Sequence, residues 1–164
     1  MAMTNLAYDT MQVCENGHLI TPGLQAFPEQ GRRFCERCGA ATIAACPSCQ
    51  HPIPGQLCEG AFHIFTDEDV MRFCGNCGRP FPWTTLKLYA AKAMADELEG
   101  LSDADRIDLK ASFDDIAANT PMAEVGVLRI KKLMRKAGKP VSDLIYKFAV
   151  DVASETAVKS MKEP

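Results

Sequence analysis

Residues 33–39 read RFCERCG, and residues 72–78 read RFCGNCG. Both stretches hold an Arg-Phe pair, two cysteines separated by two residues, and a glycine directly after the second cysteine. Two thiols at this spacing can turn toward one metal ion, and the glycine permits the positive φ angle that ends such a turn. A repeat that keeps cysteines, an aromatic residue and a turn residue together indicates tandem structure. We therefore predict a fold built on metal-binding hooks.

The repeat extends upstream of these two stretches. A shift of 32 positions places Cys14 on Cys46, and places residues 22–23 on residues 54–55, a Pro-Gly pair in both copies. The RFC stretches themselves are 39 positions apart, so the second copy carries seven additional residues in its loop. The interpretation is a duplicated module with an insertion in the second copy.

Each copy offers four donors of the kind that bind zinc. The second copy has two C-x-x-C hooks, whereas the first has one such hook and a cysteine followed four residues later by a histidine. Thiolate sulfur and imidazole nitrogen are good zinc ligands, and a set of four leaves no open coordination position. We predict two structural Zn²⁺ ions per chain, bound by Cys14, His18, Cys35 and Cys38 in the first copy and by Cys46, Cys49, Cys74 and Cys77 in the second.

Other arrangements stay open at this point. The cysteines could be buried thiols or disulfides, or hooks from the two copies could share an ion in an interleaved pairing. Cys58 and His63 lie in the longer loop of the second copy and have no repeat partners. We interpret Cys58 as a free thiol or a packed side chain, with a substitute ligand or a reactive thiol as the alternative.

The composition is that of a folded protein. The chain has 164 residues, of which 47% are hydrophobic and 24% charged, and a formal net charge of −3. It contains no apolar run of the length that a membrane-spanning helix needs, and residues 1–12 do not resemble a secretory signal. We therefore expect a cytoplasmic protein without a membrane partner, in which a cysteine cluster indicates a metal site rather than a disulfide framework.

The two halves of the chain follow different composition rules. Residues 1–82 hold all eight cysteines and all three histidines, with five basic and eight acidic residues. Residues 83–164 hold neither residue type and balance 13 basic against 13 acidic residues. We predict a tandem zinc-ribbon domain with short β-hairpins over 1–82 and a C-terminal helical domain over 83–164, which together make a small α+β protein. Trp83 lies at this junction, and we expect it to pack between the domains.

The second half predicts about four antiparallel helices. Thr84 or Thr85 can cap a first helix that runs to Glu99, and Ser102 can cap a second that runs to about Asn119. Thr120 and the following proline begin a third helix, which ends at glycine 138 after a basic last turn. The proline at position 140 can open the fourth. Its apolar residues recur at helical spacing, at Val141, Leu144, Ile145, Phe148, Ala149 and Val152.

Several stretches resemble a bacterial family of uncharacterised zinc-ribbon proteins, domain of unknown function 2321. They are residues 8–18 (YDTMQVCENGH), 34–40 (FCERCGA), 46–49 (CPSC) and 74–83 (CGNCGRPFPW). The resemblance covers nearly the whole chain, including the helical half. It implies the zinc-ribbon assignment of the eight predicted ligands. The family has no established activity, so the resemblance implies no reaction.

Three functions follow from these features. The first is a non-catalytic interaction or adaptor protein, in which zinc ribbons present loops and the helical domain offers grooves to a protein partner. The alternative is nucleic-acid binding through the basic helix 129–139, where Arg129, Lys132 and Lys136 share one face. Catalysis is the third. The nearest catalytic group is His63 with the acidic residues 67–69, and we expect no enzyme because the sequence has no nucleophile motif and no Gly-rich phosphate loop.

Overall fold

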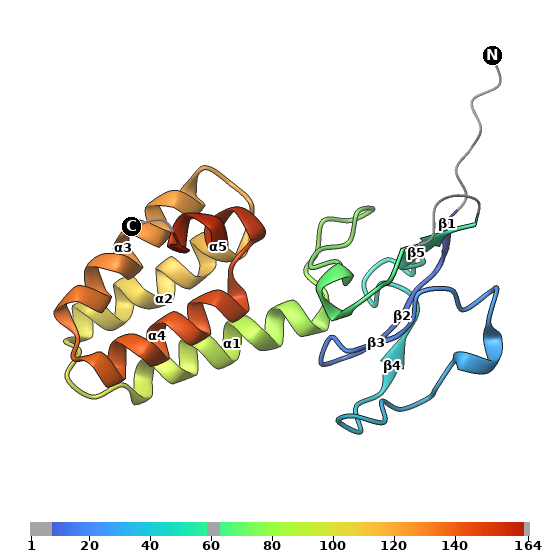
Figure 1. Ribbon diagram of the computed structural model, residues 1–164, viewed down its shortest axis with the longest axis horizontal. Helices are drawn as coiled ribbons and strands as arrows, with labels where there is room; N and C mark the ends of the chain where they lie inside the picture. Colours follow the sequence, from blue (N-terminus) through green and yellow to red (C-terminus); the bar gives the residue numbers. More distant parts are fainter. Residues whose placement is uncertain (1–7, 59–62, 163–164) are drawn as a thin grey trace, which may run out of the picture. The chain divides into compact units, whose positions relative to one another are not determined.

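The computed structural model describes residues 8–58 and 63–162 (Figure 1). The chain divides into two compact units, Met1–Thr85 and Leu86–Pro164. The described part of the first unit contains five short β-strands, two 3-10 turns and the first residues of α1, and the second unit contains the rest of α1 and the helices α2 to α5. This is the small α+β fold that the sequence predicts, with short antiparallel strand pairs, two clusters of cysteine and histidine, and a helical part.

The strands of the first unit are all antiparallel. Strand β2 (Gln12–Cys14) lies between β3 (Leu19–Thr21) and β4 (Thr42–Ile43), while β1 (Tyr8–Thr10) pairs with β5 (Pro54–Leu57). The β1–β5 pair joins the beginning of the first copy to the second copy. The two ribbons therefore interlock in one unit.

The two copies also share one hydrophobic core. Met11 and Val13 of the first copy pack with Ile53 and Val70 of the second, and each is no more than 8% exposed. Two cysteines of the second copy, Cys46 and Cys74, belong to the same cluster with Phe81 and Trp83. Two of the predicted metal ligands thus form part of the core itself.

Trp83 is buried in the core of the first unit. Its side chain is 3% exposed and its ring stacks on Phe81 at 4.7 Å between ring centroids. The indole N–H donates a hydrogen bond to the carbonyl of Met71 at 2.8 Å, which satisfies its one polar atom. We expected Trp83 to pack between the domains, whereas all of these partners belong to the first unit.

The helices begin and end close to the predicted residues. Helix α1 begins at Pro82, ahead of the predicted cap at Thr84 or Thr85, because proline suits the first helical position, where its missing N–H has no cost. Ser102 caps α2, and its hydroxyl accepts a hydrogen bond from the N–H of Asp105 at 3.2 Å. The bounds are Pro82–Glu97 for α1, Asp103–Ala117 for α2, Met122–Lys136 for α3, Lys139–Val152 for α4 and Glu155–Lys162 for α5.

Helix α5 adds one helix to the predicted number. The chain is extended at Ala153, and the hydroxyl of Ser154 then accepts a hydrogen bond from the N–H of Ala157 at 3.4 Å. Ala157 and Met161 are the buried residues of this short helix. A serine followed by only two apolar positions at helical spacing is a weak sequence signal, which is why α5 was missed.

The helical unit has a continuous apolar core. Helix α3 packs against α2, α4 and α5. Leu109, Phe113, Ile130 and Ile145 are fully buried in the core. In the described residues, no helix is both long enough and apolar enough to cross a membrane.

Candidate metal centres

Three of the four predicted ligand hooks share one backbone geometry, and we call these C-x-x-C turns knuckles. In the first, the N–H of Cys35 donates to the carbonyl of Ala40, and the N–H of Gly39 donates to the carbonyl of Cys35, both at 2.8 Å. The knuckles that begin at Cys46 and Cys74 repeat both hydrogen bonds at the same distance. An isolated β-bridge flanks each knuckle. Each turn is therefore closed by backbone groups and presents two sulfurs on one side.

The last residue of each knuckle turn has a positive φ angle. Gly39 and Gly78 have φ values of 73° and 72°, as the glycines in the repeat predict. The third knuckle has Gln50 in this position with φ at 60°. A left-handed conformation costs a non-glycine residue about 1–2 kcal/mol. The hydrogen bonds of the knuckle therefore impose the turn even where glycine is missing.

The fourth hook is the hairpin between β2 and β3. Cys14 ends β2 and His18 directly precedes β3; the N–H of Cys14 donates to the carbonyl of His18 at 3.0 Å. Gly17 lies inside this turn with φ at 89°, and a Cβ atom there would lie 2.9 Å from Cβ of Trp83. Only glycine meets both conditions without strain. Trp83 thus backs the loop that carries the histidine.

The structure brings the eight predicted ligands into two groups of four. Within each group the donor atoms all lie within 4.8 Å of one another. The grouping follows the sequence and is not interleaved. We call the group of Cys14, His18, Cys35 and Cys38 site 1, and the group of Cys46, Cys49, Cys74 and Cys77 site 2.

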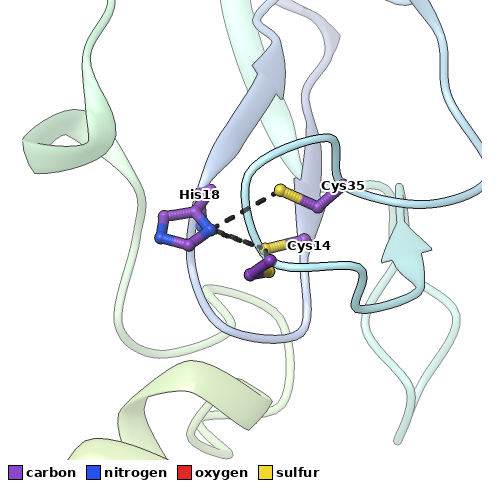
Figure 2. A group of neighbouring side chains, drawn as sticks. Cys14, His18 and Cys35 are labelled. Atoms are coloured by element: carbon purple, nitrogen blue, oxygen red, sulfur yellow. Dashed lines mark hydrogen bonds between the residues drawn. The ribbon is translucent and has the colours of Figure 1, made fainter.

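The donor separations in site 1 argue against disulfides. Nδ1 of His18 lies 3.5 Å from the sulfurs of both Cys14 and Cys35, and Figure 2 shows the ring turned toward these two sulfurs. The sulfurs of Cys14 and Cys38 are 3.8 Å apart. A disulfide needs about 2.05 Å. None of the eight cysteines forms a disulfide.

Site 2 has the same spacing. The sulfur of Cys46 lies 3.8 Å from that of Cys77, and the sulfur of Cys49 lies 3.7 Å from that of Cys74. A tetrahedral ion with bonds of about 2.3 Å to sulfur places its sulfurs about 3.8 Å apart, and an imidazole nitrogen bound at about 2.0–2.1 Å lies about 3.5–3.6 Å from them. Both donor sets therefore fit a tetrahedral metal ion.

A side-chain amide supports one sulfur in each site. Asn16 Nδ2 lies 3.3 Å from the sulfur of Cys38, and Asn76 Nδ2 lies 3.6 Å from the sulfur of Cys49. The N–H of Ala40, with the Asn16 amide, lowers the pKa of Cys38 to about 6. The N–H of His51 and the Asn76 amide likewise lower the pKa of Cys49 to about 6. Each site therefore has a thiol prepared to be a thiolate, the form that binds metal.

Thiols in the same sites resist ionisation. Burial is the main cause that raises the pKa of Cys14. The N–H of Arg79 lowers the pKa of Cys77, but burial and the facing thiols of site 2 together raise it to about 11. Four thiolates without a counter-ion would repel one another, and a bound cation reverses this effect.

The remaining candidate residues lie outside both sites. Cys58 is exposed and lines an open cavity of about 790 Å³ with His63 and Asp69. Nε2 of His63 lies 3.0 Å from Oδ1 of Asp69, which confines the predicted histidine–acid contact to one of the three acidic residues. Asp67 instead contacts Leu19 and Arg37 of the first copy. The spacing of the ligands did not predict the contacts of Asn16 and Asn76 with cysteine sulfurs, nor the contacts of Asp67.

No curated protein and no solved structure matches the chain. The model of one bacterial family, described as an uncharacterized protein conserved in bacteria (DUF2321), matches residues 7–161. This match includes every ligand of both sites and nearly all of the helical part, and it agrees with the resemblance drawn from the sequence. The chain therefore belongs to this uncharacterised bacterial family.

Proposed function

We propose that the protein binds two structural zinc ions, one in each site. The observation that carries this proposal is the spacing of the donors, with sulfurs 3.7–3.8 Å apart and an imidazole nitrogen 3.5 Å from two of them. These separations are those of a tetrahedron with zinc bond lengths. Thiolates are soft donors, so the sites disfavour magnesium and calcium.

Metal analysis tests this proposal directly. Protein purified without added metal and without chelator is expected to carry about two zinc ions per chain. A matched variant with Cys74→Ser and Cys77→Ser loses two donors of site 2 and is expected to retain about one. Protein with metal content near zero, or with iron as its main metal, would contradict the proposal.

We infer further that the protein is a non-catalytic adaptor that binds a protein partner. Four protein donors in each site leave no position for a substrate, as is typical of structural zinc. Large aromatic side chains stand exposed on rigid elements: Phe34 is 58% exposed at the start of a knuckle, and Tyr89 is 73% exposed on α1. Aromatic residues held in this way commonly anchor protein interfaces.

The basic helix gives less support to nucleic-acid binding. Arg129 forms an ion pair with Asp115 at 2.9 Å, and Lys136 forms one with Asp105 at 2.7 Å. A phosphate backbone would have to compete with these carboxylates for two of the three cations on the proposed face. The third cation of that face is Lys132, which lies between Arg129 and Lys136 in the sequence and is exposed to solvent.

The adaptor proposal needs a defined partner. The zinc-loaded full chain is used to capture proteins from bacterial extract, and each candidate is then purified and its affinity measured by calorimetry. Phe34→Ser and Tyr89→Ser serve as matched variants in the first and second units. One of them is expected to weaken binding by about tenfold or more if its side chain is an anchor. Salt-sensitive retention on a nucleic-acid column that is lost with Lys132→Glu would instead favour the alternative.

A further inference from the structure

The longer loop of the second copy brings a carboxylate to site 1. Asp67 begins the 3-10 turn η2 (Asp67–Asp69) and lies in the segment between the two knuckles of site 2. Its Oδ1 accepts a hydrogen bond from the N–H of Leu19 at 2.8 Å, and its Oδ2 forms an ion pair with Arg37 at 2.6 Å. Leu19 directly follows the histidine ligand, and Arg37 lies inside the knuckle of site 1. One carboxylate therefore holds both hooks of that site.

The charge on Asp67 suits this contact. Burial opposes ionisation, but the Leu19 N–H and the Arg37 guanidinium more than offset it and lower the pKa of Asp67. A charge-assisted hydrogen bond is stronger than a neutral one. The carboxylate is ionised at neutral pH and can hold both partners.

The turn that carries Asp67 is itself fixed. The hydroxyl of Thr66 accepts a hydrogen bond from the N–H of Glu68 at 3.2 Å, and Oδ2 of Asp69 accepts one from the N–H of Thr66 at 2.7 Å. Val70 follows directly and packs in the core cluster that also contains one cysteine from each knuckle of site 2. The position of Asp67 therefore depends on the fold around site 2.

A second contact connects the same regions. Trp83 follows the last knuckle of site 2 by six residues and packs against Gly17, in the loop that ends at His18. The chain on both sides of this knuckle thus contacts the hairpin of site 1. The two copies are linked through their metal-binding parts as well as through the β1–β5 pair.

We propose that the two metal sites are energetically coupled and that Asp67 is the positioning residue that couples them. The inference rests on the proposed metal binding. Metal in site 2 would hold together the two knuckles that flank Asp67 in the sequence, which would reduce the conformations open to Asp67. The ordered carboxylate then holds the two hooks of site 1 in place. Coupling of this kind is reciprocal, so metal in site 1 raises the affinity of site 2 by the same factor.

Cobalt(II) titration of the metal-free full chain tests the positioning role. A site with three thiolates and one imidazole differs from a four-thiolate site in its visible absorption bands, so the two sites are followed separately. Asp67→Asn is expected to lower the cobalt affinity of site 1 by about tenfold, the lower end of the effect of outer-shell ligand partners. Arg37→Gln, which leaves the Leu19 contact, is expected to lower it less. Glu68→Gln, an exposed neighbour with the same change of charge, is the control.

Site 2 is then removed to test the coupling. Cys74→Ser with Cys77→Ser is expected to lower the affinity of site 1, and adding Asp67→Asn in that background is expected to have little further effect, because the contact is already lost. A full further tenfold loss would show that Asp67 acts independently of site 2. Unchanged site 1 affinity in the single Asp67→Asn variant, or an equal loss in Glu68→Gln, would overturn the inference even if both sites bind cobalt. Failure of the wild-type chain to bind cobalt at either site would instead reject the proposed metal binding.

Discussion

The two units of this chain keep their folds by different means. Among the described residues, the helical unit has a core cluster of sixteen buried residues, whereas the cluster of the first unit has eight, of which two are cysteines of site 2. A core that small supplies little hydrophobic stabilisation, and small domains of this kind usually need a metal or another cross-link. With metal bound as proposed, coordination replaces apolar burial in the first unit. We therefore expect different perturbations to unfold the two units.

Metal removal should produce the largest effect. Treatment with a strong chelator is expected to unfold the first unit, because binding free energies of structural zinc are on the order of 10–16 kcal/mol. The helical circular dichroism signal should remain, since the core of α2 to α5 contains no ligand. Loss of the helical signal together with the metal would contradict the view that only the first unit depends on metal for its fold. Addition of zinc should restore the first unit.

A cavity in the helical core should destabilise the second unit and leave the first unit folded. Phe113 is fully buried on α2, and Phe113→Ala is expected to cost the second unit about 3–5 kcal/mol in free energy of unfolding. Urea unfolding followed by helical circular dichroism measures this loss. The zinc content should stay at the wild-type value. Ile107→Ala on the same helix is the control, because Ile107 is 67% exposed and should change stability little.

Substitutions of two glycines in the hooks of site 1 distinguish the cost of backbone strain from the cost of a packing clash. In Gly39→Ala the added Cβ atom has no neighbour within 4 Å. The substitution should therefore lower the free energy of unfolding of the first unit only through the positive φ, by about 1–2 kcal/mol. Gly17→Ala adds a contact of 2.9 Å with Trp83 and should cost about 2–4 kcal/mol. Zinc release to a chromophoric chelator during urea unfolding measures both variants. Equal losses would mean that Trp83 moves aside without cost.

The smallest expected effect concerns acid stability of the helical unit. Lys136 and Ser102 lower the pKa of Asp105 below its usual value. The ionised carboxylate therefore contributes stability above its unfolded pKa of about 3.9, and this contribution is lost as the pH falls toward the folded pKa. Asp105→Asn should lower the melting temperature near neutral pH only slightly, because the pair is at the surface. The difference from wild type should vanish at low pH; a constant difference would exclude ionisation as the cause.

Local features of both units could be predicted from the sequence. The knuckles follow from the spacing of the cysteines and, in two of the three, from the glycine after the second cysteine, because their hydrogen bonds join residues within one turn. Ser102 marks the start of α2 for an equally local reason, whereas α1 begins at Pro82, ahead of the predicted cap at Thr84 or Thr85. Gln50 shows the limit of such rules, since the knuckle at site 2 adopts the glycine conformation without a glycine.

Contacts between distant residues could not be predicted in the same way. The β1–β5 pair and the contact of Asp67 with Leu19 join residues nearly 50 positions apart, and nothing in either segment specifies the other. Asn16 and Asn76 were missed because an asparagine in a loop is usually a turn residue. Their amides reach the sulfur of another hook only after both hooks have folded around one centre.

The placement of Trp83 gives the molecule its own optical reporter. It is the single tryptophan of the chain, and it lies in the core of the first unit, stacked on Phe81 and bonded to Met71. Fluorescence excited selectively at tryptophan therefore reports unfolding of the first unit alone, while far-ultraviolet ellipticity is dominated by the helices. One unlabelled sample should thus report the unfolding of both units separately in a single titration.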